Sequence, residues 1–123
     1  MPGETSTRVL RIAQGVREEL ASLLADEVRD PGAQGVVVTR VTVAGDLRSA
    51  RVHVRLLEGG DDLARRKQLI ASLGRAAGML RREVGQRLSL RFAPELRFFY
   101  DDGTDNASRV EELLAEIEAD RRK

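Results

Sequence analysis

The stretch Ile70–Leu88, IASLGRAAGMLRREVGQRL, decides the fold, because its pattern is helical although glycines lie inside it. Apolar residues recur every three or four positions, which is typical of a helix with one buried face. Gly74 and Gly78 interrupt this pattern, and a glycine inside a helix costs about 0.5–1 kcal/mol relative to alanine. The apolar pattern continues in phase across Gly78, so we expect a kink or a tight pair of helices here, not a loop.

Positive charge gathers in the same part of the chain, although the 123 residues carry a net charge of only +1. From Leu63 to Arg97, nine basic residues stand against only Glu83 and Glu95, which gives this segment a net charge of +7. Such a segment indicates either a surface for a polyanion or a set of separately solvated charges.

The sequence before the basic segment predicts a helix followed by a strand hairpin. The helix begins near Arg8, with Ser6 or Thr7 as its cap, and ends at the turn formed by Asp30–Gly32. The β-branched stretch GVVVTRVTVA, residues 35–44, predicts the first strand. One face of that strand is expected to carry Val37, Thr39, Val41 and Val43.

The second strand, ARVHVRLL at residues 50–57, alternates between apolar and polar side chains. This alternation predicts an antiparallel hairpin with one packed face and one wet face. The packed face carries Ala50, Val52, Val54 and Leu56. Arg51, His53 and Arg55 are expected on the wet face, where His53 is either a solvated side chain or a ring that contacts RNA.

The remaining sequence predicts a third strand and a last helix. LSLRFAPELRFFYDD, residues 88–102, contains the strand, and Phe92, Leu96 and Phe98 are expected in the core. An amphipathic helix is expected from about Asp105. The predicted fold class is therefore α+β, with helices covering one face of a small three-stranded sheet.

Sequence motifs for catalysis are missing. One histidine and no cysteine exclude the usual Cys–His pairs and multi-histidine metal sites. No phosphate-binding glycine loop or nucleophile elbow occurs, so we expect no catalytic residue, metal or cofactor. Asp101, Asp102 and Asp105 form either a strand-end turn with a helix cap or a cation site of a metal-dependent nuclease. No apolar run suits a membrane span or a signal peptide, which favours the cytoplasm.

Several motifs together resemble one family. The order of elements resembles a type II KH domain, but the GxxG loop that joins the helices of ordinary KH domains is absent. Ala76, Ala77 and Gly78 instead resemble the AxG kink of bacterial ribosome-binding factor A. EVRDP at 27–31, DLRSARVHV at 46–54 and PELRFFYDD at 94–102 match that family in order and spacing, as does SRVEELLAEIE at 108–118.

The resemblance implies a non-enzymatic assembly factor that binds the immature small ribosomal subunit and its ribosomal RNA, and that assists maturation of the RNA's 5′ end. It implies a monomer with a single KH-like RNA-binding domain over residues 8–118, between flexible tails at 1–7 and 119–123. The candidate RNA-binding residues are Arg51, His53, Arg55, Arg65, Arg66, Lys67, Arg75, Arg81, Arg82, Arg87 and Arg91. An alternative is a protein adapter that uses the last amphipathic helix.

Overall fold

The computed structural model describes residues 6–103. Its elements follow the predicted order of helix, strand, strand, helix and strand, with one short 3₁₀ helix added. The elements are α1 (Thr7–Asp26), η1 (Pro31–Ala33), β1 (Val36–Val43), β2 (Ser49–Leu56), α2 (Leu63–Arg87) and β3 (Glu95–Tyr100). The predicted last helix, residues 1–5 of the proposed tail at 1–7, and the proposed tail at 119–123 lie outside the described residues. No helix within residues 6–103 has the length and apolar character that a membrane crossing needs.

Helix α1 begins where a side chain satisfies one of its free backbone N–H groups, and a second capping side chain stands at the start of η1. The hydroxyl of Ser6 accepts a hydrogen bond from the backbone N–H of Val9 at 3.1 Å, as predicted for a helix cap. The carboxylate of Asp30 then caps η1 by accepting from the N–H of Gly32 at 3.0 Å. The buried face of α1 is Val9, Val16, Leu20, Leu23 and Leu24.

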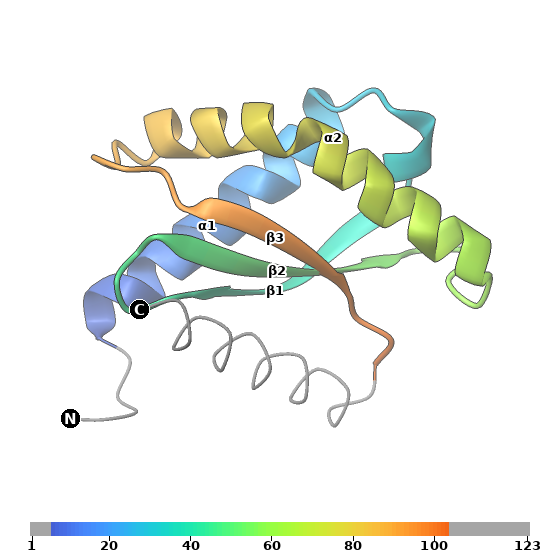
Figure 1. Cartoon of the computed structure of the whole chain (residues 1–123), viewed down its shortest axis with the longest axis horizontal. Helices are drawn as coiled ribbons and strands as arrows, with labels where there is room; N and C mark the ends of the chain where they lie inside the picture. Colours follow the sequence, from blue (N-terminus) through green and yellow to red (C-terminus); the bar gives the residue numbers. More distant parts are fainter. Residues whose placement is uncertain (1–5, 104–123) are drawn as a thin grey trace.

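The sheet has the strand order β1-β2-β3, so β2 is the central strand. Strands β1 and β2 are antiparallel, as predicted, whereas β3 pairs with β2 in parallel, with Glu95 opposite Ser49. Figure 1 shows α1 and α2 on the same face of this sheet. The core between the helices and the sheet contains Ala50, Val52, Val54 and Leu56, which confirms the predicted packed face of the second strand.

The predicted face of the first strand is wrong for its first half. The pairing register of β1 shifts between Val38 and Arg40, so Thr39 forms a bulge. A bulge adds one residue and reverses which side chains face the core beyond it. Val38 and Val43 are therefore both buried, although they are five positions apart. Val37 and Thr39 therefore do not lie on the core face, although the alternation of the sequence predicted them there.

Two further side chains differ from expectation. His53, expected on the wet face of β2, has 0% of its surface exposed, and its ring lies 5.7 Å from that of Phe99. Phe92, expected in the core, is 76% exposed in the loop after α2. The core receives Leu96, as predicted, with Phe98 packed partly against it.

Candidate nucleic-acid interface

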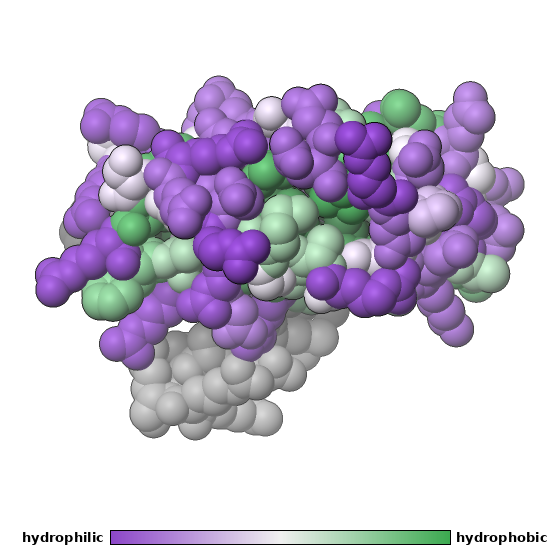
Figure 2. Space-filling view, turned by 90° about the horizontal axis from the view of Figure 1, so that it is seen from above, coloured by the Kyte–Doolittle hydropathy of each residue, from purple (hydrophilic) through white to green (hydrophobic). Residues whose placement is uncertain are grey.

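Helix α2 places the basic residues by keeping its apolar side against the sheet. Asp62 caps the helix by accepting from the N–H of Ala64 at 2.9 Å. Four apolar side chains with no exposed surface hold the helix against the core: Leu69, Leu73, Leu80 and Val84. Figure 2 looks onto the molecule from above the view of Figure 1 and shows hydrophilic side chains over most of that side.

We call one exposed strip of α2 its outer face. It consists of Lys67, Ala71, Gly74, Arg75, Gly78, Arg81 and Arg82, all of which are exposed. On a helix, these positions are close to one another and opposite the buried row. The small residues Ala71, Gly74 and Gly78 thus run along the middle of the strip. The cations of the strip lie at its ends and along both of its sides.

The helix is continuous but not straight. The structure has one α-helix from Leu63 to Arg87, which corrects the expectation of a helix pair. Figure 1 shows α2 changing direction near its middle, where its colour passes from yellow-green to yellow. Ala76 is half-buried and packs partly against the core, while Gly78 is exposed. That the small residues Ala76, Ala77 and Gly78 cause the bend stays a prediction.

Packing inside the protein does not explain the glycines of the outer face. A Cβ atom added at Gly74 or Gly78 would meet no atom within 4 Å outside the neighbouring backbone of the helix itself. At Gly85, in contrast, a Cβ would lie 2.8 Å from the Cβ of Ala93. Gly85 therefore permits the following loop to lie against the helix, whereas Gly74 and Gly78 leave open backbone surface.

Several predicted RNA-binding arginines hold the protein together. Arg75 forms an ion pair with Asp30 at 2.7 Å, and Arg87 forms one with Glu19 at 3.3 Å. Arg66 donates to the carbonyl of Gly60 and stacks 4.5 Å above the ring of Tyr100. Sequence reasoning identified these cations but not their internal partners.

The other cations of α2 are held less firmly. Some form single hydrogen bonds, and others form no ion pair within the described residues. Arg65 donates to Oε1 of Gln68 at 3.1 Å, and Arg81 donates from Nε to the carbonyl of Ala93 at 3.0 Å. Lys67 and Arg82 are exposed and form no ion pair within residues 6–103. The outer face therefore carries positive charge that these contacts do not neutralise.

Arg51, His53 and Arg55 do not extend this surface. They alternate with the core residues of β2, so their side chains belong to the face of the sheet opposite the helices. Arg55 is exposed there, Arg51 is half-buried and His53 is buried. The expectation that His53 is an exposed side chain is wrong.

Asp101, the first acidic residue after β3, has a structural explanation. The hydroxyl of Thr39 donates to Oδ2 of Asp101 at 2.7 Å, and the N–H of Gly103 donates to Oδ1 at 3.0 Å. These hydrogen bonds, that of Thr39 first, hold the pKa of Asp101 below its usual value. Within residues 6–103, no group of three acidic, histidine or cysteine residues is placed to hold a metal ion. Asp105 lies outside the described residues.

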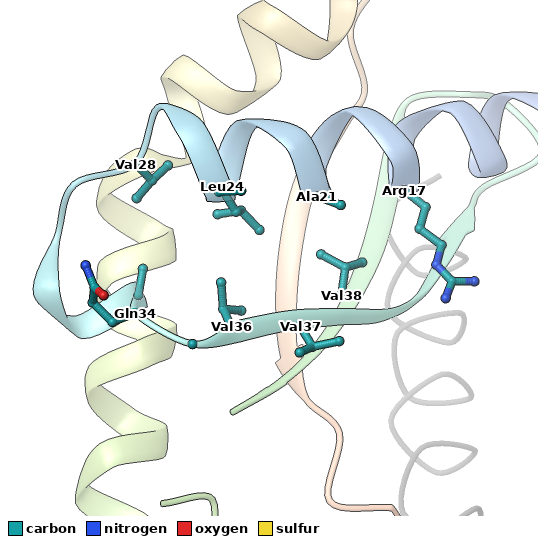
Figure 3. A pocket seen from close by; sticks show the side chains of 11 residues that line it. Arg17, Ala21, Leu24, Val28, Gln34, Val36, Val37 and Val38 are labelled. Atoms are coloured by element: carbon teal, nitrogen blue, oxygen red, sulfur yellow. The ribbon is translucent and has the colours of Figure 1, made fainter. Parts of the chain in front are cut away.

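A hollow opens between α1 and the edge strand β1, and no residue of α2 lines it. Figure 3 shows Ala21 and Leu24 of α1, and Val28 just after that helix, above Val36 and Val38 of β1, with Arg17 at one end. Its lining is mainly aliphatic, and Arg17 is the charged side chain among the residues that line it. This lining supplies no converging polar groups of the kind that orient a cofactor.

The family model described as ribosome-binding factor A matches residues 8–114. The chain belongs to the ribosome-binding factor A family. A ribosome-binding factor A from Sorangium cellulosum is 50% identical over 110 residues, which cover 89% of this chain and 88% of that protein. The family resemblance seen in the sequence is thereby confirmed.

Solved structures of the ribosome-binding factor A family share the α+β, KH-like fold. A Thermotoga maritima protein described as a ribosome-binding factor A matches with a TM-score of 0.67 at 28% identity, over 84% of this chain and 95% of that one. A homology model of ribosome-binding factor A from Thermus thermophilus, as fitted into a cryo-electron-microscopy map of a 30S complex, matches with a TM-score of 0.53 at 20% identity. That match covers 78% of this chain and 93% of the other.

Proposed function

We propose that this chain binds the immature small ribosomal subunit, with the outer face of α2 against ribosomal RNA. In this role it assists assembly and maturation of the RNA's 5′ end without catalysing a reaction. Membership of the ribosome-binding factor A family supports the proposal, as does the relative from Thermus thermophilus described in a 30S complex. We further propose that residues 8–118 act as one RNA-binding domain of a monomer in the cytoplasm.

The observation that carries the RNA contact is the open backbone at Gly74 and Gly78 between cations. Both glycines weaken the helix, and no contact within the described protein requires them. Their value is explained if another backbone approaches closely, with its phosphates beside Arg81 and Arg82. Arginine suits such an approach because its planar guanidinium matches phosphate oxygens.

The cations of α2 fall into two groups under this proposal. Lys67, Arg81 and Arg82 contact RNA, and Arg75 joins them through Nη1, which its bonds to Asp30 and Ser72 leave unused. Arg66 and Arg87 act mainly within the protein. Binding then depends on RNA shape and backbone charge more than on sequence.

The first test is sedimentation of the tagged protein through a sucrose gradient. We expect it in fractions that hold small subunits with precursor RNA, and not with translating ribosomes. Recovery only as free protein, or only with large subunits, would show that the proposed partner is wrong.

The second test compares Arg82→Glu with Arg55→Glu. The two substitutions change charge equally, and both side chains are exposed and without an ion pair in residues 6–103, but they lie on opposite sides of the sheet. We expect Arg82→Glu to weaken small-subunit binding about tenfold and to lower the salt slope by about one. Arg55→Glu should remain within about twofold of the parent. Equal effects of the two variants on small-subunit binding would show that α2 is not the specific contact surface.

A further inference from the structure

Phe92 is an exposed aromatic side chain on a loop that the protein holds in place. At 76%, it is the most exposed of the four large hydrophobic side chains that protrude from residues 6–103. A single exposed apolar residue is ordinary on a protein surface, so its exposure alone indicates nothing. The surroundings of Phe92 carry the inference.

Contacts on both sides of Phe92 anchor its loop to α2 and β3. The N–H of Leu90 donates to the carbonyl of Gly85 at 2.9 Å, and the carbonyl of Ala93 accepts from Arg81 at 3.0 Å. Pro94 is fully buried. Because Ala93 occupies the space that a side chain at position 85 would need, the loop lies directly against the helix. Phe92 is therefore presented from a fixed backbone beside the outer face of α2.

The charge around the ring favours an anionic partner. The guanidinium carbon of Arg91 lies 5.5 Å from the centre of the Phe92 ring, within cation–π distance. The two carboxylates of residues 81–97 pair with neighbouring arginines: Glu83 with Arg87 at 3.8 Å, and Glu95 with Arg97 at 3.7 Å. Arg81, Arg82 and Arg91 form no ion pair within the described residues.

We propose that Phe92 stacks on an unpaired nucleobase of the bound RNA, with Arg91 beside the same base or its phosphate. This inference rests on the proposed function and adds to it a single-stranded nucleotide next to the backbone contact on α2. Aromatic side chains stack on bases of any identity, because every base has a flat π face. An apolar protein surface would fit the ring but not the guanidinium of Arg91 beside it.

Affinity measurements with substituted side chains test the stacking. Because the ring is exposed, we expect Phe92→Ala to leave the melting temperature unchanged and to weaken small-subunit binding about 5- to 150-fold. Phe92→Tyr should retain affinity, since it keeps the aromatic face. Phe92→Leu should bind as weakly as Phe92→Ala. Wild-type affinity of Phe92→Leu would mean an apolar protein contact and would overturn the proposal, as would wild-type affinity of Phe92→Ala.

A fluorescence measurement tests the contact directly. The chain has no tryptophan, so Phe92→Trp introduces a single reporter at this position. We expect small subunits carrying precursor RNA to quench its emission. Leu57→Trp is the matched control, since Leu57 is 69% exposed and lies beyond the far end of β2. That position is roughly 26 Å along the strand from the end that pairs with Glu95.

The outcomes separate this inference from the proposed function. If the parent protein binds subunits and Phe92→Trp is not quenched, the stacking is wrong while the proposed function stands. If the parent protein does not bind small subunits at all, both are refuted. Stacking also predicts that Phe92→Ala keeps the parent's salt slope, whereas loss of a phosphate contact would lower it.

Discussion

The guanidinium of Arg75 donates to Oδ2 of Asp30 through both Nε, at 3.2 Å, and Nη2, at 2.7 Å. Nη2 also donates to the hydroxyl of Ser72 at 3.0 Å. Asp30 in turn caps η1, so the pair ties the connection between α1 and β1 to the middle of α2. A residue expected only to contact RNA thus also holds the protein's own chain.

Asp30→Asn should destabilise the protein at neutral pH and not at acidic pH. The hydrogen bond from Arg75, followed by that from Gly32, holds the pKa of Asp30 below its usual value. A lowered carboxyl pKa stabilises the fold above the unfolded-state pKa, near 4, and this stabilisation is lost as the pH falls through the folded-state pKa. Urea denaturation of both proteins between pH 7 and pH 3 measures the difference. Asp61→Asn, in the exposed loop before α2, is the control, and a difference independent of pH would contradict the expectation.

Gly74→Ala and Gly78→Ala should stabilise the protein while weakening its binding to small subunits. Each substitution places a methyl group in open space and raises the free energy of unfolding by about 0.5–1 kcal/mol. The same methyl group would obstruct an approaching RNA backbone. Gly85→Ala is the contrasting variant, because its Cβ would overlap Ala93 and lower the stability. Stabilised variants with unchanged affinity would show that RNA does not approach this surface.

His53→Ala should destabilise the protein without a specific effect on RNA binding. Removing a buried ring that packs near Phe99 leaves a cavity, which costs about 2–4 kcal/mol. Arg55→Ala, at an exposed position of the same strand, should change the stability by less than about 0.5 kcal/mol. Chemical denaturation measures both, and affinity is compared under conditions where each variant is folded. A stable His53→Ala variant with impaired binding would contradict this expectation and show that His53 contributes to the RNA interface.

Sequence patterns predicted the elements well because the burial of α1, β2 and α2 is periodic. Sequence patterns mispredicted the buried face of β1 around Thr39. The bulge there depends on how β1 pairs with β2, and the alternation of apolar residues along β1 does not reveal it. Sequence patterns also mispredicted the exposure of His53, because alternation shows which face of a strand a side chain lies on but not what packs against that face. The exposure of Phe92 follows from the fit of Ala93 against Gly85, a contact between residues eight positions apart.

The candidate RNA surface was predictable as a region more than residue by residue. The basic segment and its glycines are visible in the sequence, and Gly74, Gly78 and seven of the nine basic residues lie on α2. Which cations are engaged internally was not visible, since Arg75 finds its partner 45 positions away at Asp30 and Arg87 finds Glu19 68 positions away. Such pairs depend on how the helices are arranged over the sheet.

The strand order also has a consequence for folding. Strands β1 and β2 are neighbours in sequence and close a short turn, but β3 reaches β2 only after α2 has crossed the sheet. Pairing Glu95 with Ser49 therefore closes a long loop. The entropic cost of closing this loop is offset only after α2 has packed on the sheet. The hairpin should gain protection from amide hydrogen exchange first during refolding, and the β3 edge last.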